Sequence, residues 1–362
     1  MAWRSSLQEI HVGGWDLPKR IGGQGVSCAN MMKVFENVGS ISIDLRDVPG
    51  AGHARLISLL RRRMFDDFLK DVIAGSAYCA VAITEEAAGS DLLSIETIAS
   101  PIGDSYVISG TKSFVSRLSE ASHAIVFCQV ARSGLVRRLT AFLVDLASPG
   151  ITIEPLRPMG ITGTSWGRLT LSSVNTSISA RIGGEGEGFQ LFRRHFSYWR
   201  AAMASAALGA CESTLELLRE HLVSRMAYGQ PLGRLTHLQQ EIAKHLYAVF
   251  VNRLLIGKVA AAMDSGEDPY VLAAMAKAEI LEFAVALHVW AQQTLGARAY
   301  QEQHPVAKRL RDLAGLAIAD GTTPTLRAQV SRGFLGDDLY DLGLGRTPGL
   351  LQRSVTTKTR FW

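Results

Sequence analysis

The chain has 362 residues, of which 47% are hydrophobic and 20% are charged, and its formal net charge is +5. This size and composition are typical of a globular protein with two or three domains, and a mild charge without an aromatic-interleaved basic stripe argues against nucleic-acid binding. Because no uninterrupted apolar run reaches about 18 residues and Met1–Ile10 lacks the apolar core of a secretory signal, we expect a cytoplasmic protein without a membrane span.

Residues 1–78 predict an N-terminal helical domain. Apolar side chains recur at helical spacing in Met31, Met32 and Phe35, and again between Leu56 and Phe68. A glycine-rich stretch at residues 22–25 predicts a flexible loop inside this domain.

Residues 79–182 predict a middle β domain, because the period of the apolar residues changes there. Short apolar runs bounded by Gly, Pro and Ser are typical of strands in a small barrel or folded sheet. The predicted strands are Tyr78–Ile83, Tyr106–Ser109, Ala124–Val130, Thr140–Val144, Ile151–Glu154 and Arg168–Leu171.

Residues 183–332 predict a helical bundle, since long apolar-rich segments alternate with short turns that carry Gly or Pro. The predicted helices are 200–226, 238–263, 270–295 and 305–319, with a shorter one over 324–332. Residues 333–362 are rich in Gly, Leu and Thr without a clear period, and we interpret them as a C-terminal extension. The predicted fold class is therefore α+β, with a helical, a β and a helical domain in that order.

The most informative stretch lies where the first predicted strand ends. Thr84 is followed by two carboxylates, two small residues and then Gly89, Ser90 and Asp91. Such a loop presents backbone N–H groups and short hydroxyls, which suit a flat polar ring. The stretch resembles the Thr-Glu-Pro-x-x-Gly-Ser-Asp signature of the acyl-CoA dehydrogenases, with Glu86 in place of the proline.

Further segments downstream resemble the same family, in the order that the family uses. These segments are Lys112–Ser116, 159–165, 183–189, Arg225–Gly229, 293–296 and 311–322. In the family they read Lys-x-Trp-Ile-Thr, Gly-x-x-x-Ser, Gly-x-Gly-Phe, Arg-x-x-Phe-Gly, Gln-x-x-Gly-Gly and an Arg-Asp pair that precedes Tyr-Glu-Gly-Thr. The resemblance extends from about Gly22 to Arg332, which is most of the chain.

The resemblance implies the fold of the family and one cofactor, FAD. Carried over residue by residue, it assigns FAD binding to Ile83, Thr84, Gly89, Ser90, Phe114, Ser116, Arg225, Tyr228, Gln293, Gly296 and Thr322. It assigns substrate binding to Ser90, Arg200 and Gly321. In the family the residues that match Arg225 and Gln293 reach FAD across a subunit interface, so the resemblance also implies at least a homodimer.

In the family a carboxylate removes the α-proton of an acyl thioester while the β-hydride goes to flavin N5. Asp320 stands eight residues after Asp312, where the family places its catalytic Glu, so the resemblance implies that Asp320 is the base. Aspartate reaches ~1.5 Å less far than glutamate, and a misplacement near 1 Å can cost about two decades in rate. The carrier of the acyl group, CoA or acyl carrier protein, and the electron acceptor, an electron-transfer flavoprotein or O₂, stay open.

Two other interpretations stay open as well. Nitroalkane oxidase, a relative, uses Asp at this position, so the first alternative is a flavin-dependent oxidase or monooxygenase, such as an N-hydroxylase, on the same fold. The departures at Glu86, Ala297, Asp320 and Pro324 leave a catalytically silent flavin-binding scaffold as the second. The short stretch before Thr84 suggests a specialised branch that acts on a carrier-bound acyl group in biosynthesis.

Cysteine and histidine spacing predicts neither a redox motif nor a metal site. Four cysteines lie far apart in the sequence, and we expect all of them to be buried free thiols. His237 and His245 stand two turns apart on one predicted helix, which is too few ligands for a metal ion.

Overall fold

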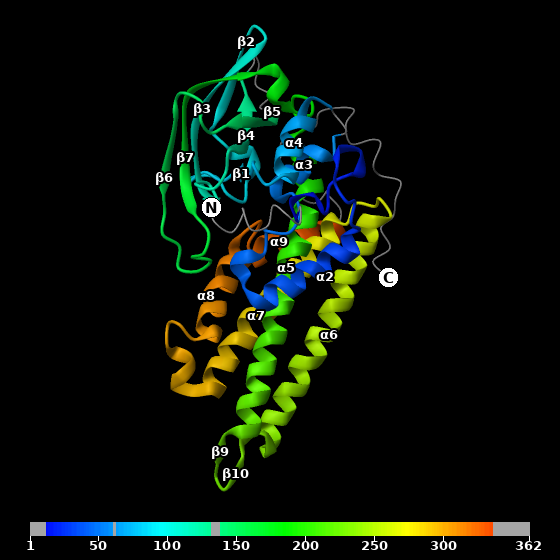
Figure 1. Ribbon diagram of the computed structural model, residues 1–362, viewed down its shortest axis with the longest axis vertical. Coiled ribbons are helices and arrows are strands. Elements are labelled where there is room, and N and C mark those ends of the chain that lie inside the picture. The colour runs from blue at the N-terminus through cyan, green and yellow to red at the C-terminus, as the bar shows by residue number, and fades with distance from the viewer. Residues whose placement is uncertain (1–11, 61–62, 132–137, 336–362) are drawn as a thin grey trace.

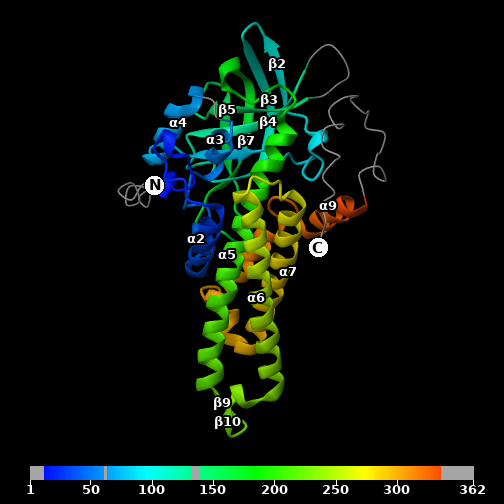
Figure 2. The same ribbon diagram turned by 90° about the vertical axis from the view of Figure 1, so that its right-hand side faces the viewer.

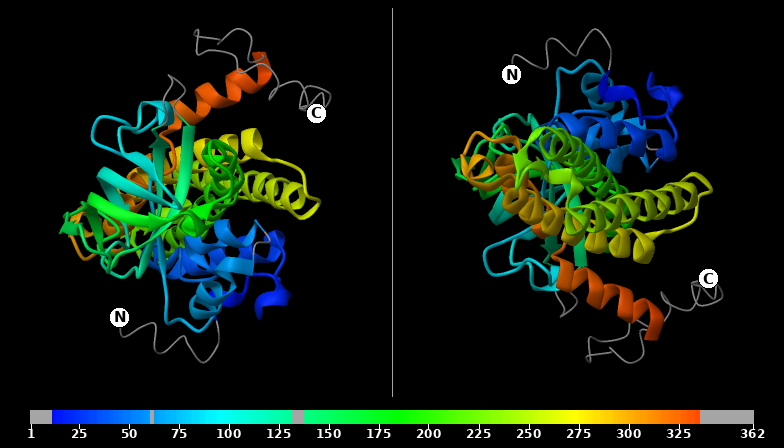
Figure 3. Two further views of the ribbon diagram at one scale, coloured as in Figure 1. Left: turned by 90° about the horizontal axis from the view of Figure 1, so that it is seen from above. Right: turned by 90° about the horizontal axis from the view of Figure 1, so that it is seen from below.

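The computed structural model describes residues 12–60, 63–131 and 138–335. An N-terminal segment of short helices packs beside a β-sheet at one end of the molecule, and long helices extend away from them (Figure 1). The long helices run side by side along the longest axis of the molecule (Figure 2). Seen along this axis, the N-terminal segment and the last helix lie on opposite sides of the sheet and the bundle (Figure 3).

The N-terminal segment is helical, as expected, but it is divided into short pieces. Its elements are η1 (Val12–Gly14), η2 (Lys19–Ile21), α2 (Cys28–Ile41), η3 (Ile43–Leu45), η4 (Gly52–Ala54), α3 (Arg55–Ser58), η5 (Arg63–Phe65) and α4 (Asp66–Ile73). Helix α2 packs closely on α5 (Gly188–Ser224), since a Cβ added to Gly39 would lie only 2.0 Å from the carbonyl oxygen of Ala206. This contact fixes the segment against the bundle.

The middle of the chain forms one sheet with the strand order β6-β7-β3-β2-β4-β5-β8, and β1 pairs with β4. Its strands are β1 (Cys79–Ala82), β2 (Ile98–Ile102), β3 (Ser105–Ser116), β4 (His123–Val130), β5 (Arg138–Asp145), β6 (Ile151–Pro155), β7 (Trp166–Ser177) and β8 (Arg181–Ile182). Neighbouring strands are antiparallel except β1 with β4 and β2 with β4. All six predicted strands are confirmed.

Strand β2 was not predicted, because Pro101 lacks the N–H that a central strand must donate. In the structure β2 pairs with β4 only through Ile98 and Ala99. Pro101 therefore lies where β2 has β3 as its one partner, and a proline is tolerated there.

The C-terminal part is a bundle of long helices, as expected. It comprises α5, a short hairpin of β9 (Met226–Ala227) and β10 (Gln230–Pro231), η8 (Leu232–Arg234), α6 (Thr236–Asp264), α7 (Tyr270–Leu295), η9 (Gly296–Tyr300), α8 (Pro305–Ile318) and α9 (Thr323–Leu335). Helix α5 begins at Gly188, well before the predicted start at Arg200. The sequence did not indicate this start, because the first turns of the helix are rich in aromatic residues and directly follow the glycine-rich run. The domain limits at residues 78, 182 and 332 stay predictions, and residues 336–362 lie outside the described residues.

Helix α6 corrects one expectation. By length and composition Thr236–Asp264 is apolar enough to cross a membrane, and 22% of its most apolar window is buried in the structure. The helix contains no uninterrupted apolar run of this length, because scattered polar residues break the run without making the whole segment polar. One such helix is weak evidence for a membrane span, and the cytoplasmic location stays a prediction.

Two large apolar cores meet along α5. One joins α5 to α2, α6, α7 and α8, and the other joins the N-terminal segment, one face of the sheet and the start of α5. All four cysteines are buried free thiols, as predicted, and burial raises the pKa of Cys28 to about 11.

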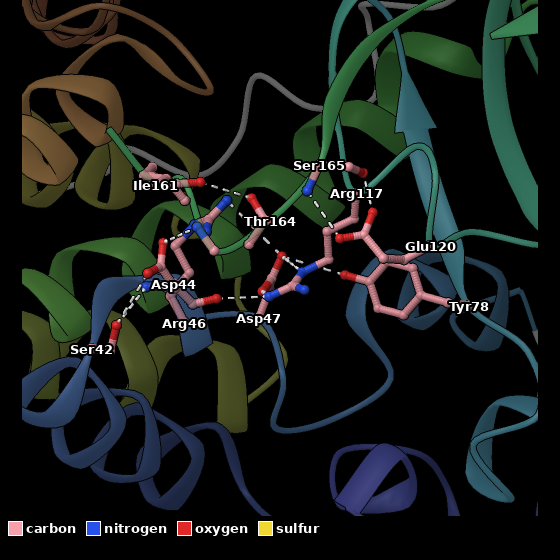
Figure 4. Close-up of polar contacts among 11 residues, drawn as sticks. Ser42, Asp44, Arg46, Asp47, Tyr78, Arg117, Glu120, Ile161, Thr164 and Ser165 are labelled. Atoms are coloured by element: carbon pink, nitrogen blue, oxygen red, sulfur yellow. Dashed lines mark hydrogen bonds and ion pairs between the residues drawn. The ribbon is translucent and has the colours of Figure 1, made fainter. Parts of the chain in front are cut away.

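A buried ion pair joins the sheet to the N-terminal segment. Arg117, which directly follows β3, donates from Nε to Asp47 Oδ2 at 2.7 Å and from Nη2 to Asp47 Oδ1 at 2.5 Å (Figure 4). Arg117 also donates to the carbonyl oxygen of Asp44 at 2.7 Å. The guanidinium of Arg117 holds the pKa of Asp47 well below its usual range despite burial, so the carboxylate stays charged.

Candidate active site

The turn between α8 and α9 carries Asp320. Helix α8 ends at Ile318, and Asp320 adopts a left-handed backbone conformation with φ +55°, followed by Gly321 with φ +107°. A left-handed conformation is unfavourable for a residue with a Cβ and persists only where its surroundings enforce it. Strain of this kind is often found at functional sites, and here it falls on the candidate base.

Two buried cations hold this turn by its carbonyl groups. Arg200 on α5 donates from Nε to the carbonyl oxygen of Asp320 at 3.1 Å. Lys277 on α7 donates from Nζ to the carbonyl oxygens of Gly321 at 2.6 Å and Ala317 at 3.0 Å. Arg200 is 3% exposed and Lys277 is fully buried, so neither side chain is free to move away. The structure thus brings Arg200, Asp320 and Gly321 together, as the resemblance implied.

Glycine is required at position 321. A Cβ there would lie 2.8 Å from Leu326 Cδ2, and the positive φ would strain any larger residue. The turn therefore depends on Gly321 as well as on the two cations.

The environment of Asp320 opposes its own ionisation. Burial raises the pKa of the Asp320 carboxyl, and the nearby positive charges of Lys277, Arg200 and Arg46 act against this rise. Burial also lowers the pKa of Lys277 to about 7, with Asp320 acting against that change. A carboxyl group whose pKa is raised binds an accepted proton more tightly than an ordinary surface aspartate does.

The loop after β1 is closed by its own hydrogen bonds, without the family's proline. The backbone N–H of Glu85 donates to Ala88 O at 2.8 Å, and the N–H of Ala88 donates back to Glu85 O at 3.2 Å. The buried Glu85 carboxylate accepts from Lys112 at 2.8 Å, and Lys112 also donates to the carbonyl oxygen of Ile83 at 2.9 Å. The loop is therefore held in shape, and the carbonyl group of Ile83 is already engaged.

Hydroxyl groups join this loop to the catalytic turn. Ser90 Oγ lies 3.3 Å from Thr325 Oγ1, which lies 2.9 Å from Thr322 Oγ1. Ser90 and Gly89 are exposed, and Thr84 is half-buried beside them. The residues assigned to the flavin and to the substrate thus approach each other from the sheet and from the bundle.

Strand β3 presents Phe114 through a bulge. The pairing of β3 with β7 shifts register between Lys112 and Val115, and Phe114 within this bulge has φ +63°. A bulge redirects a side chain out of the regular pleat. The Phe114 ring is 45% exposed and stacks on Trp166 with ring centroids 5.2 Å apart, while Ser116 pairs opposite Trp166 across the strands. The result is an accessible aromatic surface beside a hydroxyl group.

The remaining assigned residues lie elsewhere in the same chain. Arg225 and Tyr228 belong to the β9–β10 hairpin, at the end of the bundle farthest from the sheet (Figures 1 and 2). Gln293 lies in the last turn of α7, and Gly296 is the first residue of η9. These two residues are exposed, as are Arg225 and Tyr228. Within one chain the structure does not bring this group to the group around Asp320.

The far group is positively charged. Burial lowers the pKa of His221, and the charges of Arg298 and Arg225 act in the same direction. Within the described part of the chain, neither Arg225 nor Arg298 forms an ion pair. Such an arrangement suits an anion.

Sequence reasoning missed three residues that shape the site. Lys277 had a signal, because it is the one lysine or arginine in the apolar-rich helix α7. Thr325 and Trp166 had none, since only the folded chain brings them to Ser90 and Phe114.

Comparisons with known proteins agree with this geometry. The family profile "Acyl-CoA dehydrogenase, middle domain" matches residues 80–174, and "Acyl-CoA dehydrogenase, C-terminal domain" matches residues 186–335. Cyclohex-1-ene-1-carbonyl-CoA dehydrogenase of Geobacter metallireducens is 31% identical over 258 residues, 71% of this chain and 68% of that protein. Human mitochondrial short-chain specific acyl-CoA dehydrogenase is 27% identical over 321 residues, 87% of this chain and 78% of that protein. The structure of butyryl-CoA dehydrogenase from Megasphaera elsdenii, 25% identical, covers 92% of this chain and 89% of its own, with a TM-score of 0.87.

The chain belongs to the acyl-CoA dehydrogenase family. Members of this family are FAD-dependent oxidoreductases that act on CH–CH groups, so the predicted family, fold class, enzyme class and cofactor are confirmed. Two features of the structure fit FAD: the accessible Phe114 ring can stack on a flat ring system, and the exposed Arg225 can bind phosphate oxygens with its planar fork.

Proposed function

We propose that the protein desaturates an acyl thioester between its α and β carbons, with Asp320 accepting the α-proton. The turn that holds Asp320 supports this role, because the buried side chains of Arg200 and Lys277 hold its backbone while Asp320 adopts a left-handed conformation. Burial raises the pKa of its carboxyl group, and the hydroxyl groups of Thr322 and Thr325 join the turn to the Ser90 loop. These are the properties of a positioned general base.

Each group around Asp320 has a part in this reaction. Arg200 positions the base by binding the carbonyl group of Asp320, and Lys277 does so by binding those of Gly321 and Ala317. Thr84, Phe114 and Ser116 would hold the ring system of FAD, and bound FAD would supply the hydride acceptor for the β carbon. Ser90, whose hydroxyl group lies against that of Thr325, is proposed to contact both cofactor and substrate.

The second group of cofactor residues supports a homodimer or a larger homo-oligomer. Because Arg225 and Gln293 lie far from Phe114 in one chain, we propose that a second copy supplies them to the FAD diphosphate. Helix α6 also exposes a series of large apolar side chains that a second copy would cover. These are Leu246, Tyr247, Phe250, Val251 and Leu254. Light scattering of the FAD-loaded protein tests this, and a monomer that retains FAD would contradict it.

The substrate is proposed to be carried by CoA or by an acyl carrier protein. The names of the relatives, cyclohex-1-ene-1-carbonyl-CoA and short-chain acyl-CoA dehydrogenases, support a thioester of this kind. The specialised biosynthetic role expected from the sequence predicts a higher kcat/KM for the acyl-carrier-protein thioester than for the same acyl-CoA. Equal or lower values would contradict that role.

An anaerobic titration tests the reaction itself. The FAD-loaded protein is mixed with a panel of saturated thioesters while the visible flavin absorbance is recorded, and loss of colour with formation of an enoyl product is expected. Absence of bleaching by every thioester would exclude the proposal. Mixing the reduced protein with O₂ then separates the alternatives: slow reoxidation is expected for a dehydrogenase that uses an electron-transfer flavoprotein, and rapid reoxidation would indicate an oxidase.

A further inference from the structure

A glutamine on α9 is hydrogen-bonded to the arginine that holds the catalytic turn. Gln329 is half-buried, and its Oε1 accepts a hydrogen bond from Arg200 Nη1 at 3.2 Å. Its Nε2 donates to the carbonyl oxygen of Tyr270, the first residue of α7, at 3.3 Å. Arg200 in turn donates from Nε to the carbonyl oxygen of Asp320 at 3.1 Å. A continuous chain of hydrogen bonds therefore runs from the start of α7 through α9 and α5 to the turn that carries the base.

The two partners of Gln329 fix the orientation of its amide group. An arginine can only donate and a backbone carbonyl group can only accept, so an amide turned over would lose both contacts. An apolar side chain has no group for either contact, and a carboxylate could accept from Arg200 but could not donate to Tyr270. The two contacts therefore use the chemistry of glutamine and not only its size.

The contact with Gln329 sets the direction of the Arg200 guanidinium. Cζ of Arg200 lies 5.0 Å from the ring centre of Tyr270 and 5.9 Å from that of Phe192. Such cation–π contacts attract the charge, whereas a hydrogen bond also restricts the angle at which the donor points. Because the guanidinium is a rigid plane, an acceptor at Nη1 also determines where Nε points, and Nε is the atom that holds the turn.

Helix α9 is itself firmly attached to α7. Arg327 donates to Glu279 at 2.8 Å and to Glu282 at 3.1 Å, and both glutamates belong to α7. Leu326 is fully buried in an apolar cluster with two alanines of α7. Gln329 is therefore presented to Arg200 from a helix that is fixed independently of this contact.

We propose that Gln329 is a positioning residue for the reaction, and that it orients Arg200 and, through Arg200, the backbone of Asp320. The inference rests on the proposed function, because it gives Gln329 a part in placing the base. A misplacement of the base near 1 Å can cost about two decades in rate, and the loss of one supporting contact should cost less than that. The expected signature is a slower reaction with unchanged binding of the thioester and of FAD.

The test compares Gln329→Met with Gln329→Glu in the FAD-loaded protein. Methionine has a similar length without the amide, whereas glutamate keeps an oxygen that accepts from Arg200. Flavin reduction is followed in a single turnover with the saturated thioester that bleaches the original protein fastest. We expect Gln329→Met to lower the limiting rate by about threefold to thirtyfold and to change the apparent dissociation constant of the thioester by less than about twofold. Gln329→Glu should keep the limiting rate within about threefold of the original.

Arg327→Gln is the matched control on the same helix. It removes the ion pairs between α9 and α7 and leaves the contact between Gln329 and Arg200, so a limiting rate within about twofold of the original is expected. If Arg327→Gln slows the reaction as much as Gln329→Met does, loosening of α9 explains the loss and the inference is wrong. It is also wrong if Gln329→Met keeps the original rate, or if Gln329→Glu is as slow as Gln329→Met.

Hydrogen–deuterium exchange separates this inference from the proposed reaction, because it needs no substrate. The N–H of Ala319 donates to the carbonyl oxygen of Gly315 at 3.0 Å, so the turn contains amides that report on its opening. Peptides that cover residues 317–323 should exchange faster in Gln329→Met than in Gln329→Glu or Arg327→Gln. Unchanged exchange in Gln329→Met would overturn the inference.

Two further outcomes are decided by the same measurements. If Gln329→Met does not fold, as judged by thermal melting, Gln329→Asn takes its place, because the shorter amide keeps the polar groups and withdraws them from Arg200. Absence of flavin bleaching by every thioester in the unsubstituted protein would remove the proposed reaction, and the exchange measurement would then still decide whether Gln329 holds the turn.

Discussion

The two ends of the helical bundle differ in how their polar groups are satisfied. At the end near the sheet, Arg200 and Lys277 are buried and their hydrogen bonds hold the turn around Asp320. At the other end, Arg225 and Tyr228 are exposed on a two-strand hairpin, and Tyr228 retains 91% of its accessible surface. The first end is assembled by one chain, whereas the second end presents its groups to something outside the chain.

This difference separates two tasks that one active site combines. Proton transfer needs a base placed to within a fraction of an ångström, which requires a rigid interior. Phosphate binding needs charge and donors but tolerates assembly from two surfaces. The comparison therefore predicts that substitutions near Asp320 change rates, whereas substitutions near Arg225 change cofactor retention.

Asp320→Asn should have the largest effect. Replacing the carboxylate by an amide removes the base and keeps the size of the side chain, so kcat is expected to fall by about 10²- to 10⁴-fold while FAD content is unchanged. The measurement is flavin bleaching in a single turnover with the best thioester. Asp104→Asn, an exposed residue in the turn between β2 and β3, is the control. Full activity of Asp320→Asn would show that another group removes the proton.

Arg225→Gln should act on the cofactor instead. Loss of a charge-assisted contact to phosphate is expected to weaken FAD binding by roughly tenfold to a hundredfold and to leave kcat at saturating FAD nearly unchanged. Equilibrium dialysis of the apoprotein with FAD measures the first quantity. Arg219→Gln, about two turns earlier on α5 and exposed, should bind FAD normally. Equal FAD affinity in both variants would remove the far end of the bundle from the cofactor site.

The arrangement of elements was largely predictable from the sequence. Helical spacing and glycine or proline punctuation indicated α7 to the residue, and all six strands that composition indicated are present. The boundary of α5 and the strand β2 were not predictable, because tertiary packing overrides the local signals of an aromatic first turn and of Pro101.

The candidate site was predictable only as separate segments. Chain motifs indicated Asp320, Arg200 and Ser90, but no sequence pattern shows that Thr325 lies against Ser90 or that Lys277 lies beneath the turn. Such contacts join residues far apart in the chain and depend on how the sheet packs on the bundle. The assignment of individual roles to these residues remains a prediction that the variants address.

Lys277→Met should change how stability depends on pH. The pKa of Lys277 is lowered from 10.5 to about 7, so between these values the unfolded chain binds a proton that the folded chain does not. The free energy of unfolding of the original protein should therefore gain up to about 1.4 kcal/mol per pH unit over this window from this one group. Below about pH 7 the group is charged in both states and contributes no slope.

Urea unfolding at a series of pH values measures this contribution as the difference between the two proteins. The variant lacks the group, so the stability of the original protein relative to Lys277→Met should rise from about pH 7 upward. Lys244→Met serves as the control, because Lys244 is exposed on α6 and pairs with Glu241. A constant difference across the window would mean that Lys277 keeps its ordinary pKa in the folded protein.

Phe114→Leu should have the smallest effect. It tests whether the flavin lies at the end of the bundle that is near the sheet. Leucine keeps an apolar side chain at the β3 bulge but removes the aromatic face that stacks on Trp166. Aromatic stacking contributes about 0.5–1.5 kcal/mol beyond buried area, so FAD binding is expected to weaken by only about twofold to tenfold. The visible flavin spectrum should shift, because the ring loses its aromatic neighbour, whereas Arg225→Gln should leave the spectrum of bound flavin unchanged.

Phe189→Leu, which replaces an exposed aromatic residue on the first turn of α5, is the control. An unchanged spectrum in Phe114→Leu would place the flavin ring away from the bulge, and the near end of the bundle would then hold the base without the cofactor.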